Sequence, residues 1–522
     1  MERTGRLAEL LASLSLATDA ANGFAREKTL RTTLLAMGLA RETGLPESEL
    51  PVAYYGALLR FVGCTGFAPE EAHRYGGGDD IQLRTTMAVV DGGQPLDALR
   101  RIGGGVGRGT GPWKRPRAVI AITSDRGVVA AHARAQCDAS RHLVDLIGVP
   151  PAVGDVLEQV FERWDGQGHP EGRAGDDLHP VTRILQVADV AELFATGHDG
   201  GPTGVDRAVA EVQRRSGGHL DPVVAAAFTA GAVDLLAPIA SGSMWDEVLD
   251  AEPGPPTALT EGGFDRAAGA FARYVDIKSQ WTAGHSTGVA ELAAAAGEAA
   301  GLGPDAQVRL RRAGWLHDLG RVAVPNRVWD KPGPLNRAER QQAEAHAYET
   351  DRILASSPVL GGVATVARAA HERVDGSGYH RGVPAALLDV EARLLAAADV
   401  HHALREDRPH RPAVDGDEAA RVVAAEAEAG HLDLAAVRAV LDAAGGTATR
   451  HRVTWPSGLT DREVEVLGLV ARGHTNKDVA RALGITPKTV AHHVAHIYDK
   501  AGCRSRAGAT LFAIEHGLAS AR

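Results

Sequence analysis

Residues 371–382 read HERVDGSGYHRG, and residues 161–172 read FERWDGQGHPEG. The two segments share Glu-Arg, Asp-Gly and two further glycines at identical offsets. The first residue, however, is His371 in one copy and Phe161 in the other. Because internal repetition indicates repeated structural units, the segments predict two related domains. Only the second copy begins with a side chain that binds metal ions readily.

The repeat extends beyond these segments in both directions. Downstream, RILQVADVAELF matches RLLAAADVHHAL, and upstream GALLRFVG matches GWLHDLGR. The alignment pairs Asp189 with Asp399, Arg60 and Phe61 with His317 and Asp318, Lys28 with His285, and Gln136 with His346. Only the aspartate of the first pair is kept, so the first copy is predicted to be a degenerate relative of the second.

Composition favours helices and more than one domain. A chain of 522 residues exceeds what one ordinary hydrophobic core accommodates. Hydrophobic residues make up 44% of it and aromatic residues only 4%, with alanine dominating the apolar positions. Alanine-rich amphipathic stretches favour helix over strand, so an all-α fold is predicted.

Charge, cysteines and the N-terminal stretch narrow the function classes. A net charge of -10 argues against coating nucleic acid along the whole chain but allows a local DNA-binding module. The three cysteines are far apart and form no C-x-x-C pair, which suits a reducing compartment. The start, MERTGRLAELLASLSL, lacks a secretion-signal layout, and no apolar run approaches about 18 residues. We therefore expect a cytoplasmic protein with no membrane partner.

Two breaks in the pattern predict the domain boundaries. The Pro/Gly cluster in MWDEVLDAEPGPPTALTEGG separates the two copies, and AAGGTATRHRVTWPSG precedes the C-terminal region. The predicted organisation is two tandem helical domains plus a small four-helix domain. The boundaries are 1–240 for the degenerate domain, 241–263 for a linker, 264–445 for the metal-binding domain, 446–457 for a second linker and 458–522 for the last domain.

The C-terminal region carries four helix-start signals. Thr460 and Glu463 form a capping box, and Thr475, Thr486 and Ser505 are expected N-caps of three further helices. The short turn GIT separates the second helix from the third. Two helices joined by such a turn predict a helix-turn-helix.

This region resembles the LuxR/FixJ-type DNA-binding domain over nearly its full length, through LTDREVEVL, TNKDVA and ITPKTVAHHVAHIYDK. The resemblance implies that the third helix lies in the major groove of double-stranded DNA and that the fourth makes a homodimer. One departure is Ala491, where the family often has Lys or Arg. Candidate contacts on the third helix are Lys488, Thr489, His492, His493 and His496, and candidate phosphate contacts are Asn476, Lys477, Lys500 and Arg504.

The second copy carries a separate set of histidines and aspartates on different predicted helices. Neutral imidazoles and carboxylates on facing helices are typical ligands of a pair of divalent metal ions, such as Fe, Mn or Mg. A single histidine on an alanine-rich helix is more often a tolerated side chain, so the inference depends on the whole set. The candidate ligands are His285, His317, Asp318, His346, His371 and Asp399.

The motifs HDLGRVAVPN, HERVDGSGYHRG and RLLAAADV, in this order, resemble the HD-GYP branch of the HD-domain phosphohydrolases. The resemblance implies a metal-dependent phosphodiesterase, usually of cyclic di-GMP, with the six candidates as ligands. It also implies that Asp318 bridges two ions and that Asp318 and Arg321 are the catalytic residues.

Three departures from this family bear on catalysis. Ala370 stands where the family has a further histidine, so the number of bound ions, one or two, is left open. Arg321 stands where the family has lysine, and it offers a planar fork in place of a compact charge. The family's Gly-Tyr-Pro ends here in His380, so proline no longer fixes that loop.

Three functions therefore compete. We favour a DNA-binding transcriptional regulator whose metal-binding domain senses or hydrolyses a phosphorylated ligand such as a cyclic dinucleotide. The alternatives are an active cyclic di-GMP phosphodiesterase controlled by its DNA-binding domain, and a catalytically dead scaffold. In the degenerate copy, Lys28 and Arg60 either bind an anion or extend to solvent as two long side chains.

Overall fold

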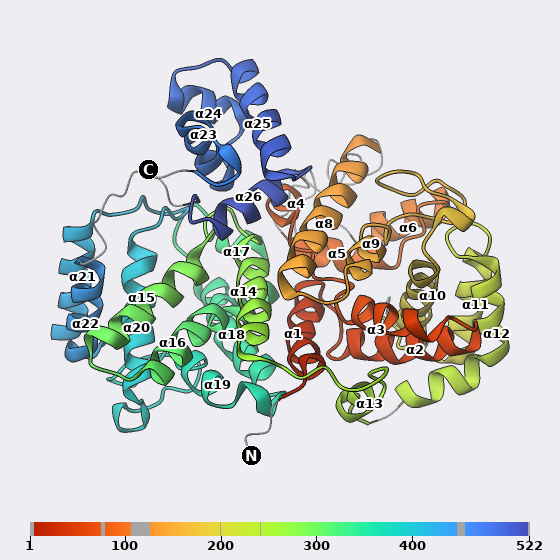
Figure 1. The fold of residues 1–522 in the computed structure, drawn as a ribbon, viewed down its shortest axis with the longest axis horizontal. Coiled ribbons are helices and arrows are strands. Elements are labelled where there is room, and N and C mark those ends of the chain that lie inside the picture. Colours follow the sequence, from red (N-terminus) through yellow and green to blue (C-terminus); the bar gives the residue numbers. More distant parts are fainter. Residues whose placement is uncertain are drawn as a thin grey trace. The chain divides into compact units, whose positions relative to one another are not determined.

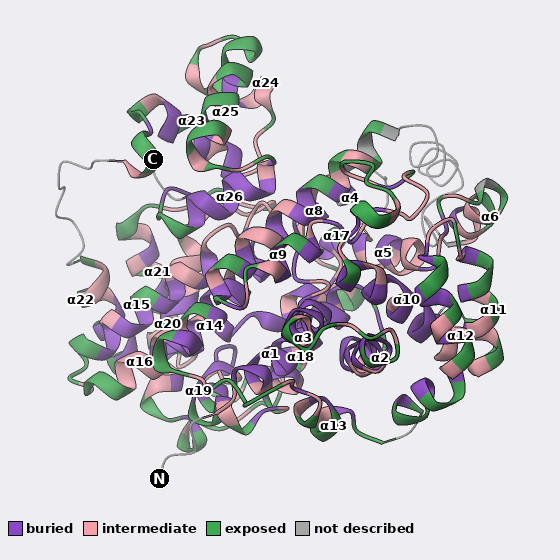
Figure 2. Ribbon diagram, turned by 45° about the vertical axis from the view of Figure 1, so that its right-hand side comes forward, coloured by how far each residue is buried: buried purple, intermediate pink, exposed green. Residues whose placement is uncertain are grey.

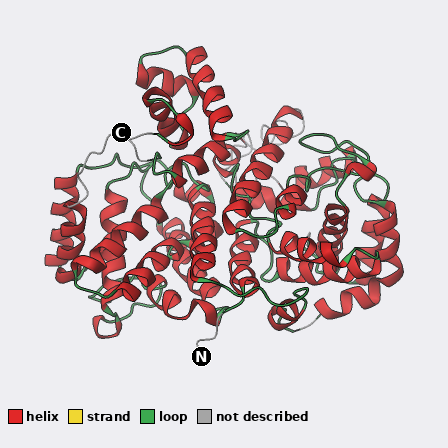
Figure 3. Cartoon of the chain, viewed as in Figure 1, coloured by secondary structure: helices red, strands yellow, loops and turns green. Residues whose placement is uncertain are grey.

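The computed structural model describes residues 5–74, 79–105, 126–198, 200–240, 242–445 and 455–519. Within these ranges the chain folds as helices joined by loops and contains no β-strand (Figure 3). The predicted all-α fold is confirmed. The chain divides into two compact units, Met1–Arg266 and Ala267–Arg522, which are described separately.

The first unit is built around three helices that carry the repeat. Helix α2 packs against α3 and α10, and α10 in turn packs against α11. Their facing sides are buried, as the purple faces in Figure 2 show. The α-helices of this unit are α1 (Leu7–Ala21), α2 (Lys28–Glu42), α3 (Leu50–Leu58), α4 (Ala68–Arg74), α5 (Asp80–Ala88), α6 (Pro95–Gly105), α8 (Arg126–Ile147), α9 (Ala152–Leu157), α10 (Pro180–Ala195), α11 (Val205–Arg215), α12 (Pro222–Leu236) and α13 (Trp245–Asp250) (Figure 1).

The segment expected to be a linker, residues 241–263, has structure of its own. It contains α13, and the Tyr54 hydroxyl donates a hydrogen bond to the carbonyl of Val248 at 2.9 Å. Further along, the amide of Leu7 donates to the carbonyl of Thr257 at 2.9 Å. Part of this segment therefore packs on the first unit, because Val248 is buried and its neighbours complete backbone hydrogen bonds there. The second expected linker, 446–457, lies outside the described residues up to position 454.

The second unit repeats the same helical arrangement. Helix α15 packs against α16 and α20, as α2 packs against α3 and α10. The helices of this unit are α14 (Glu261–Asp276), α15 (His285–Ala299), α16 (Pro304–Leu316), η4 (Leu319–Ala323), α17 (Asn326–Trp329), α18 (Arg337–Leu354), α19 (Gly361–Ala367), α20 (Val390–Leu404), α21 (Gly416–Glu428), α22 (Leu434–Gly445), α23 (Asp461–Ala471), α24 (Asn476–Leu483), α25 (Pro487–Ala501) and α26 (Arg506–Glu515).

The first turns of α2 and α15 show the repeat at atomic detail. Each helix follows a residue in the left-handed region, Glu27 with φ 67° and Gly284 with φ 84°. This conformation turns the chain sharply into the helix, and glycine adopts it without steric cost. Lys28 and His285, which the sequence alignment pairs, are consequently the first residues of their helices.

The four helices of the C-terminal module begin where the sequence predicts. Thr460 and Glu463 form a complete capping box at α23. Thr475, Thr486 and Ser505 each accept a hydrogen bond from the third backbone amide that follows. These side chains satisfy amides that have no partner within the helix.

One helix of the first unit is longer and more apolar than expected, since no apolar run approaching about 18 residues was predicted. Helix α12 with its short extension covers Pro222–Ile239 and is long and apolar enough to cross a membrane by length and composition. A single helix of this kind is weak evidence, because core helices have the same composition. Here Phe228 is fully buried, and α12 packs against α2 and α11.

Candidate metal centre and nucleic-acid interface

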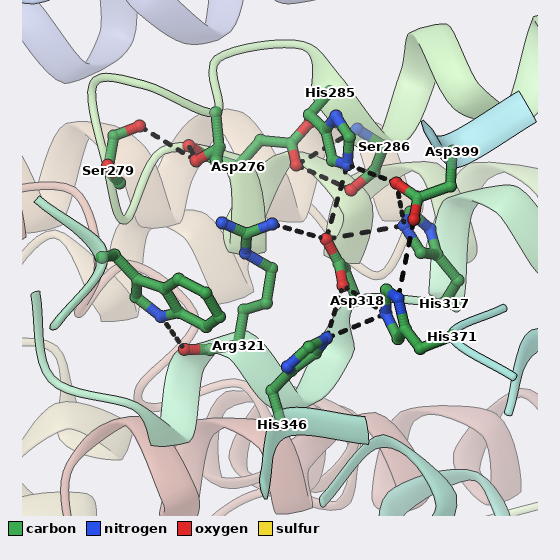
Figure 4. A network of polar contacts seen from close by, with 12 residues as sticks. Asp276, Ser279, His285, Ser286, His317, Asp318, Arg321, His346, His371 and Asp399 are labelled. Atoms are coloured by element: carbon green, nitrogen blue, oxygen red, sulfur yellow. Dashed lines mark hydrogen bonds and ion pairs between the residues drawn. The ribbon is translucent and has the colours of Figure 1, made fainter. Parts of the chain in front are cut away.

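The fold brings the six predicted metal ligands of the second unit to one place (Figure 4). Helix ends and loops supply four of them, and helix interiors supply the other two. His285 opens α15, His317 and Asp318 follow α16, His346 lies within α18, His371 follows α19, and Asp399 lies within α20.

Asp318 lies at the centre of this cluster. Its Oδ1 is 3.2 Å from Nε2 of His371 and 3.3 Å from Nε2 of His346. Its Oδ2 is 3.5 Å from Nε2 of both His285 and His317. Each carboxylate oxygen therefore faces a different pair of imidazoles, which is the arrangement that a carboxylate between two ions requires.

Asp399 closes the cluster on the opposite side. Its Oδ1 is 3.3 Å from Nε2 of His285 and 3.8 Å from Nε2 of His317, and its Oδ2 is 3.5 Å from Nδ1 of His371. Two sets of three side chains present ligand atoms within 4.8 Å of one another. One set is His285, His317 and Asp399, and the other is His317, Asp318 and His371.

The burial of the cluster favours a bound ion. His317 is fully buried and Asp318 is 1% exposed, and even Asp399 is only 8% exposed. Within the described part of the chain, Nε2 of His317 is buried without a hydrogen-bond partner. A buried polar atom without a partner is costly, and a metal ion would provide that partner. The donor set, imidazoles with carboxylates, fits a divalent transition metal.

Electrostatic effects set the protonation states of the cluster. Burial alone would raise the pKa of Asp318, but the charges of His317 and Arg321 and the contacts with His346 and His371 together hold this pKa well below its usual range. Burial lowers the pKa of His371 to about 4. Burial also acts to lower the pKa of His285, but the charge of Glu406 and the contacts with Asp399 and Glu406 together raise the pKa to about 10. Near neutral pH, Asp318 is thus ionised and His371 is neutral, the forms that bind metal, whereas the imidazolium of His285 would release its Nε2 proton when an ion binds.

Arg321 contacts the central carboxylate directly. Its Nη1 donates a hydrogen bond to Oδ2 of Asp318 at 2.9 Å. The guanidinium lies over the ring of Trp329, 4.2 Å from the ring centroid, and the indole N–H of Trp329 donates to the carbonyl of Arg321. This stacking, which a lysine would make less well, fixes Arg321 beside Asp318.

Two of the three departures from the family pattern are neighbours in sequence of His371 or of Tyr379, which stacks on it. Ala370 is fully buried and supplies no ligand atom. The ring of Tyr379 stacks on His371, with an interplanar angle of 7° and centroids 5.4 Å apart. His380 turns away from the cluster, and its Nε2 lies 3.3 Å from Oδ2 of Asp351.

The corresponding place in the first unit contains a different chemistry. Lys28 is fully buried and forms an ion pair with Asp189. Its Nζ also lies over the ring of Phe61, 4.5 Å from the centroid. Nη2 of Arg60 is 3.8 Å from Oδ2 of Asp189, and Phe161 stands where the second unit has a histidine. Lys28 therefore neither extends to solvent nor offers a free charge to an anion.

Three residues of the second unit that were not predicted from the sequence support the cluster: Asp276, Ser286 and Glu406. Asp276 accepts hydrogen bonds from the amide and the hydroxyl of Ser286, at 3.0 and 2.7 Å, and so caps α15 beside His285. Oε2 of Glu406 lies 2.9 Å from Nδ1 of His285. The signal for the cap was present, because an acidic residue precedes the hydroxyl residue by ten positions in both copies, as Asp19 does for Thr29.

Most predicted DNA contacts lie on the surface of the C-terminal module. Lys477, Lys488, Thr489, His492, His496 and Arg504 are exposed, whereas Asn476 and His493 are half-buried. Lys500 is exposed in part, but its Nζ lies 2.7 Å from Oε2 of Glu463. Between the two helices of the helix-turn-helix, Gly484 has φ 65° and ends α24. Because a left-handed residue ends the helix sharply, α25 begins three residues later.

Comparison with protein families identifies two kinds of domain. The model of the HD domain matches residues 118–224 and 270–436, which together exceed half of the chain. The model of bacterial regulatory proteins of the luxR family matches residues 457–513.

Individual relatives point to the same group of proteins. The chain is 28% identical to 3'3'-cGAMP-specific phosphodiesterase 3 of Vibrio cholerae, over 81% of this chain and 91% of the relative. It is 38% identical to 3'3'-cGAMP-specific phosphodiesterase 1 of the same species, over 31% of this chain and 38% of that relative. A cyclic di-GMP phosphodiesterase of Pseudomonas aeruginosa is 34% identical over 32% of this chain and 40% of its own length. The crystal structure of a cyclic GMP-AMP specific phosphodiesterase of V. cholerae matches with a TM-score of 0.57 and 25% identity, over 85% of this chain and 98% of that one.

Proposed function

Because the chain belongs to the HD domain family and ends in a luxR-family module, we propose that it is a DNA-binding regulator with a metal-dependent phosphodiesterase in its second HD domain. The substrate class is a cyclic dinucleotide such as 3'3'-cGAMP or cyclic di-GMP. The degenerate first domain has no part in the chemistry.

The observation that carries the proposal is the position of Asp318. Its two oxygens face two different pairs of imidazoles, and the whole cluster is shielded from solvent. The described residues of the first unit contain no comparable set of three ligand atoms. The names of the relatives add the substrate class, since they are phosphodiesterases of cyclic dinucleotides.

Hydrolysis of a cyclic dinucleotide requires attack of water on phosphorus. The water oxygen forms a bond to phosphorus, the bond from phosphorus to one ribose oxygen breaks, and that oxygen takes a proton. Divalent ions, when bound, supply the Lewis acidity that activates water and neutralises phosphate charge. In this chain Asp318 would hold two ions together, and Arg321 would keep Asp318 oriented through the 2.9 Å hydrogen bond.

The ligand set favours iron or manganese over magnesium. Four of the six candidates are histidines, and imidazole suits transition metals, whereas magnesium prefers oxygen ligands. The loss of a ligand position at Ala370 weakens the part of the cluster that contains His346 and His371. The ion held by His285, His317 and Asp399 is therefore proposed to be the tighter of the two.

Metal removal tests this function directly. Purified protein is expected to contain one or two iron or manganese ions per chain and to linearise 3'3'-cGAMP or cyclic di-GMP. Treatment with a chelator should abolish product formation, and added Mn²⁺ or Fe²⁺ should restore it. Elemental analysis and chromatography of the nucleotide products measure both quantities. Turnover that persists in metal-free protein, or metal-loaded protein that cleaves no cyclic dinucleotide, contradicts the proposed activity.

A second candidate function is a metal-containing sensor that binds a cyclic dinucleotide without cleaving it. The missing ligand at Ala370 favours this alternative, because a single ion binds phosphate but does not clamp both reacting oxygens. Equilibrium dialysis with 3'3'-cGAMP distinguishes the two candidates. Binding with no linear product would indicate the sensor.

DNA binding is tested by the substitution Lys488→Ala. Lys488 is exposed at the start of α25, so removal of its charge should weaken binding to a mixed-sequence duplex without unfolding the module. If it contacts a phosphate, the slope of log affinity against log salt should fall by about one unit. Fluorescence anisotropy at several salt concentrations measures this slope.

The control for this substitution is Lys331→Ala, which removes a lysine of the second HD domain that pairs with Glu339. It should leave the salt slope unchanged. An unchanged slope and affinity in Lys488→Ala would refute the assigned DNA contact. Loss of metal in that variant would contradict the assignment of DNA binding and metal binding to separate domains. Repeating the titration with added 3'3'-cGAMP checks whether the two functions are coupled.

A further inference from the structure

A group of polar side chains that the predicted ligand set does not include lies next to His285. It consists of His402 on α20 and of Glu406 and Arg408 just after that helix. Oε2 of Glu406 is 2.9 Å from Nδ1 of His285, and the opposite ring nitrogen of His285 faces Asp399 at 3.3 Å. Glu406 thus contacts a candidate ligand on the side away from the metal centre.

The other ligand histidines on helices are held in a different way. Nδ1 of His317 lies 2.7 Å from the carbonyl of Gly314, and Nδ1 of His346 forms the same contact with the carbonyl of Ala343. Each of these carbonyls belongs to the preceding turn of the same helix. His285 is the first residue of α15, so no preceding helical turn offers it a carbonyl. A carboxylate from a distant part of the sequence takes that position.

Glu406 is itself held in place by two neighbours. Nη2 of Arg408 donates to Oε2 of Glu406 at 2.6 Å, and Nδ1 of His402 lies 3.3 Å from Oε1. The side chain of Glu406 is 16% exposed. Arg408 also comes within 3.4 Å of Nδ1 of His285. His285, His402 and Glu406 are close enough to one another to bind a further metal ion. The positive charge of Arg408 would repel such an ion.

We propose that Glu406, clamped by Arg408 and His402, is a positioning residue for the metal centre. It accepts a hydrogen bond from Nδ1–H of His285 and thereby selects the tautomer whose Nε2 lone pair faces Asp318 and Asp399. A carboxylate in this role also makes the imidazole a stronger donor to the ion. The inference rests on the proposed metal-dependent function and adds a specific residue to it.

The test compares Glu406→Ala and Glu406→Gln with wild type and uses Mn²⁺ as the probe. Loss of a hydrogen-bond partner of this kind typically costs about 10–100-fold in metal affinity, so Glu406→Ala should bind Mn²⁺ weaker by about that factor. Glu406→Gln keeps an oxygen that accepts from Nδ1–H and should recover most of the affinity. Competition with a chelator of known affinity measures each value.

A matched control and a second readout separate positioning from a structural role. Glu428→Ala removes an exposed glutamate near the end of α21 and should leave the Mn²⁺ affinity unchanged. The melting temperature of metal-free Glu406→Gln should stay close to that of the metal-free wild type, because its amide oxygen still accepts from His285, while the increase in melting temperature caused by Mn²⁺ should shrink in Glu406→Ala. A lowered melting temperature without metal, together with unchanged affinity, would show a structural role and overturn the inference.

The remaining outcomes distinguish this inference from the proposed function. If wild type binds Mn²⁺ and both Glu406 variants bind it equally well, the positioning role is overturned and the metal centre stands. If Glu406→Gln is as weak as Glu406→Ala, selection of the tautomer is overturned, because the charge alone would matter. If wild type binds no divalent ion, the proposed function and the positioning role fail together.

Discussion

Asp318→Asn is expected to abolish both metal binding and the proposed phosphodiesterase activity of the second HD domain. The two carboxylate oxygens of Asp318 face two pairs of imidazoles within 3.2–3.5 Å. Asparagine has almost the same size, but its amide group replaces one oxygen with a donor that cannot bind an ion. Because loss of a hydrogen-bond partner of a ligand alone costs about 10–100-fold, loss of this central ligand should reduce turnover by more than about 100-fold.

The control is the same change from aspartate to asparagine at another position, on α16. Asp305→Asn lies at the exposed start of α16, the helix that ends directly before His317. It should keep the full metal content and cost no more than the roughly 0.3–1 kcal/mol that an acidic residue contributes at a helix start. Metal analysis and product formation are compared in the two purified variants. An Asp318→Asn protein that retains its metal would remove Asp318 from the centre.

The candidate ligands were predictable because the residue types and the order of the motifs already indicate metal binding. His317 and Asp318 are adjacent in the sequence, and Asp399 lies at the same distance from His371 as Asp189 does from Phe161. The N-caps of the last module were also predictable, because a cap is a local interaction between a side chain and an amide within about three residues. Contacts of this kind do not depend on how the rest of the chain folds.

The contact of Glu406 with His285 was not predictable in this way. Glu406 reaches His285 across 121 positions of sequence, and only the folded path after α20 brings the two together. Asp399, His402 and Glu406 are spaced by three and four residues, as on one helical face, but the same spacing is common on exposed helices. The sequence also left two interpretations of Lys28 open, and the structure replaces both with a buried ion pair.

This ion pair explains how the first domain keeps the fold without the metal ligands. Asp189 is the one carboxylate that the degenerate copy retains, and a buried carboxylate requires a positive partner. In the second domain that partner would be a metal ion, whereas in the first it is the ammonium group of Lys28. Phe24 and Phe61 surround this ammonium group and exclude water. Because this positive charge belongs to a side chain of the protein, a chelator cannot remove it.

Lys28→Met should therefore destabilise the first domain strongly. The substitution keeps the apolar stem but leaves Asp189 as a buried charge, with only Arg60 at 3.8 Å as a partial partner. Breaking a buried ion pair in this way typically costs about 3–5 kcal/mol, so hydrogen exchange of the α2 and α10 amides should become much faster. Lys331→Met, at a partly exposed pair in the second domain, should change exchange in α2 and α10 by an amount too small to detect.

The double variant Lys28→Met with Asp189→Asn decides whether the charge pair itself is responsible. With both charges removed, Arg60 alone loses an ion-pair partner, and it still lies over the rings of Phe61 and Phe161. Part of the lost free energy of unfolding should therefore return, because an apolar replacement of a buried pair is often close to neutral. If the double variant is as unstable as Lys28→Met, packing of the lysine stem and not its charge supports the fold. If chelation of wild type lowers the protection of α2 and α10, the first domain also depends on a metal, and Lys28 is not its substitute.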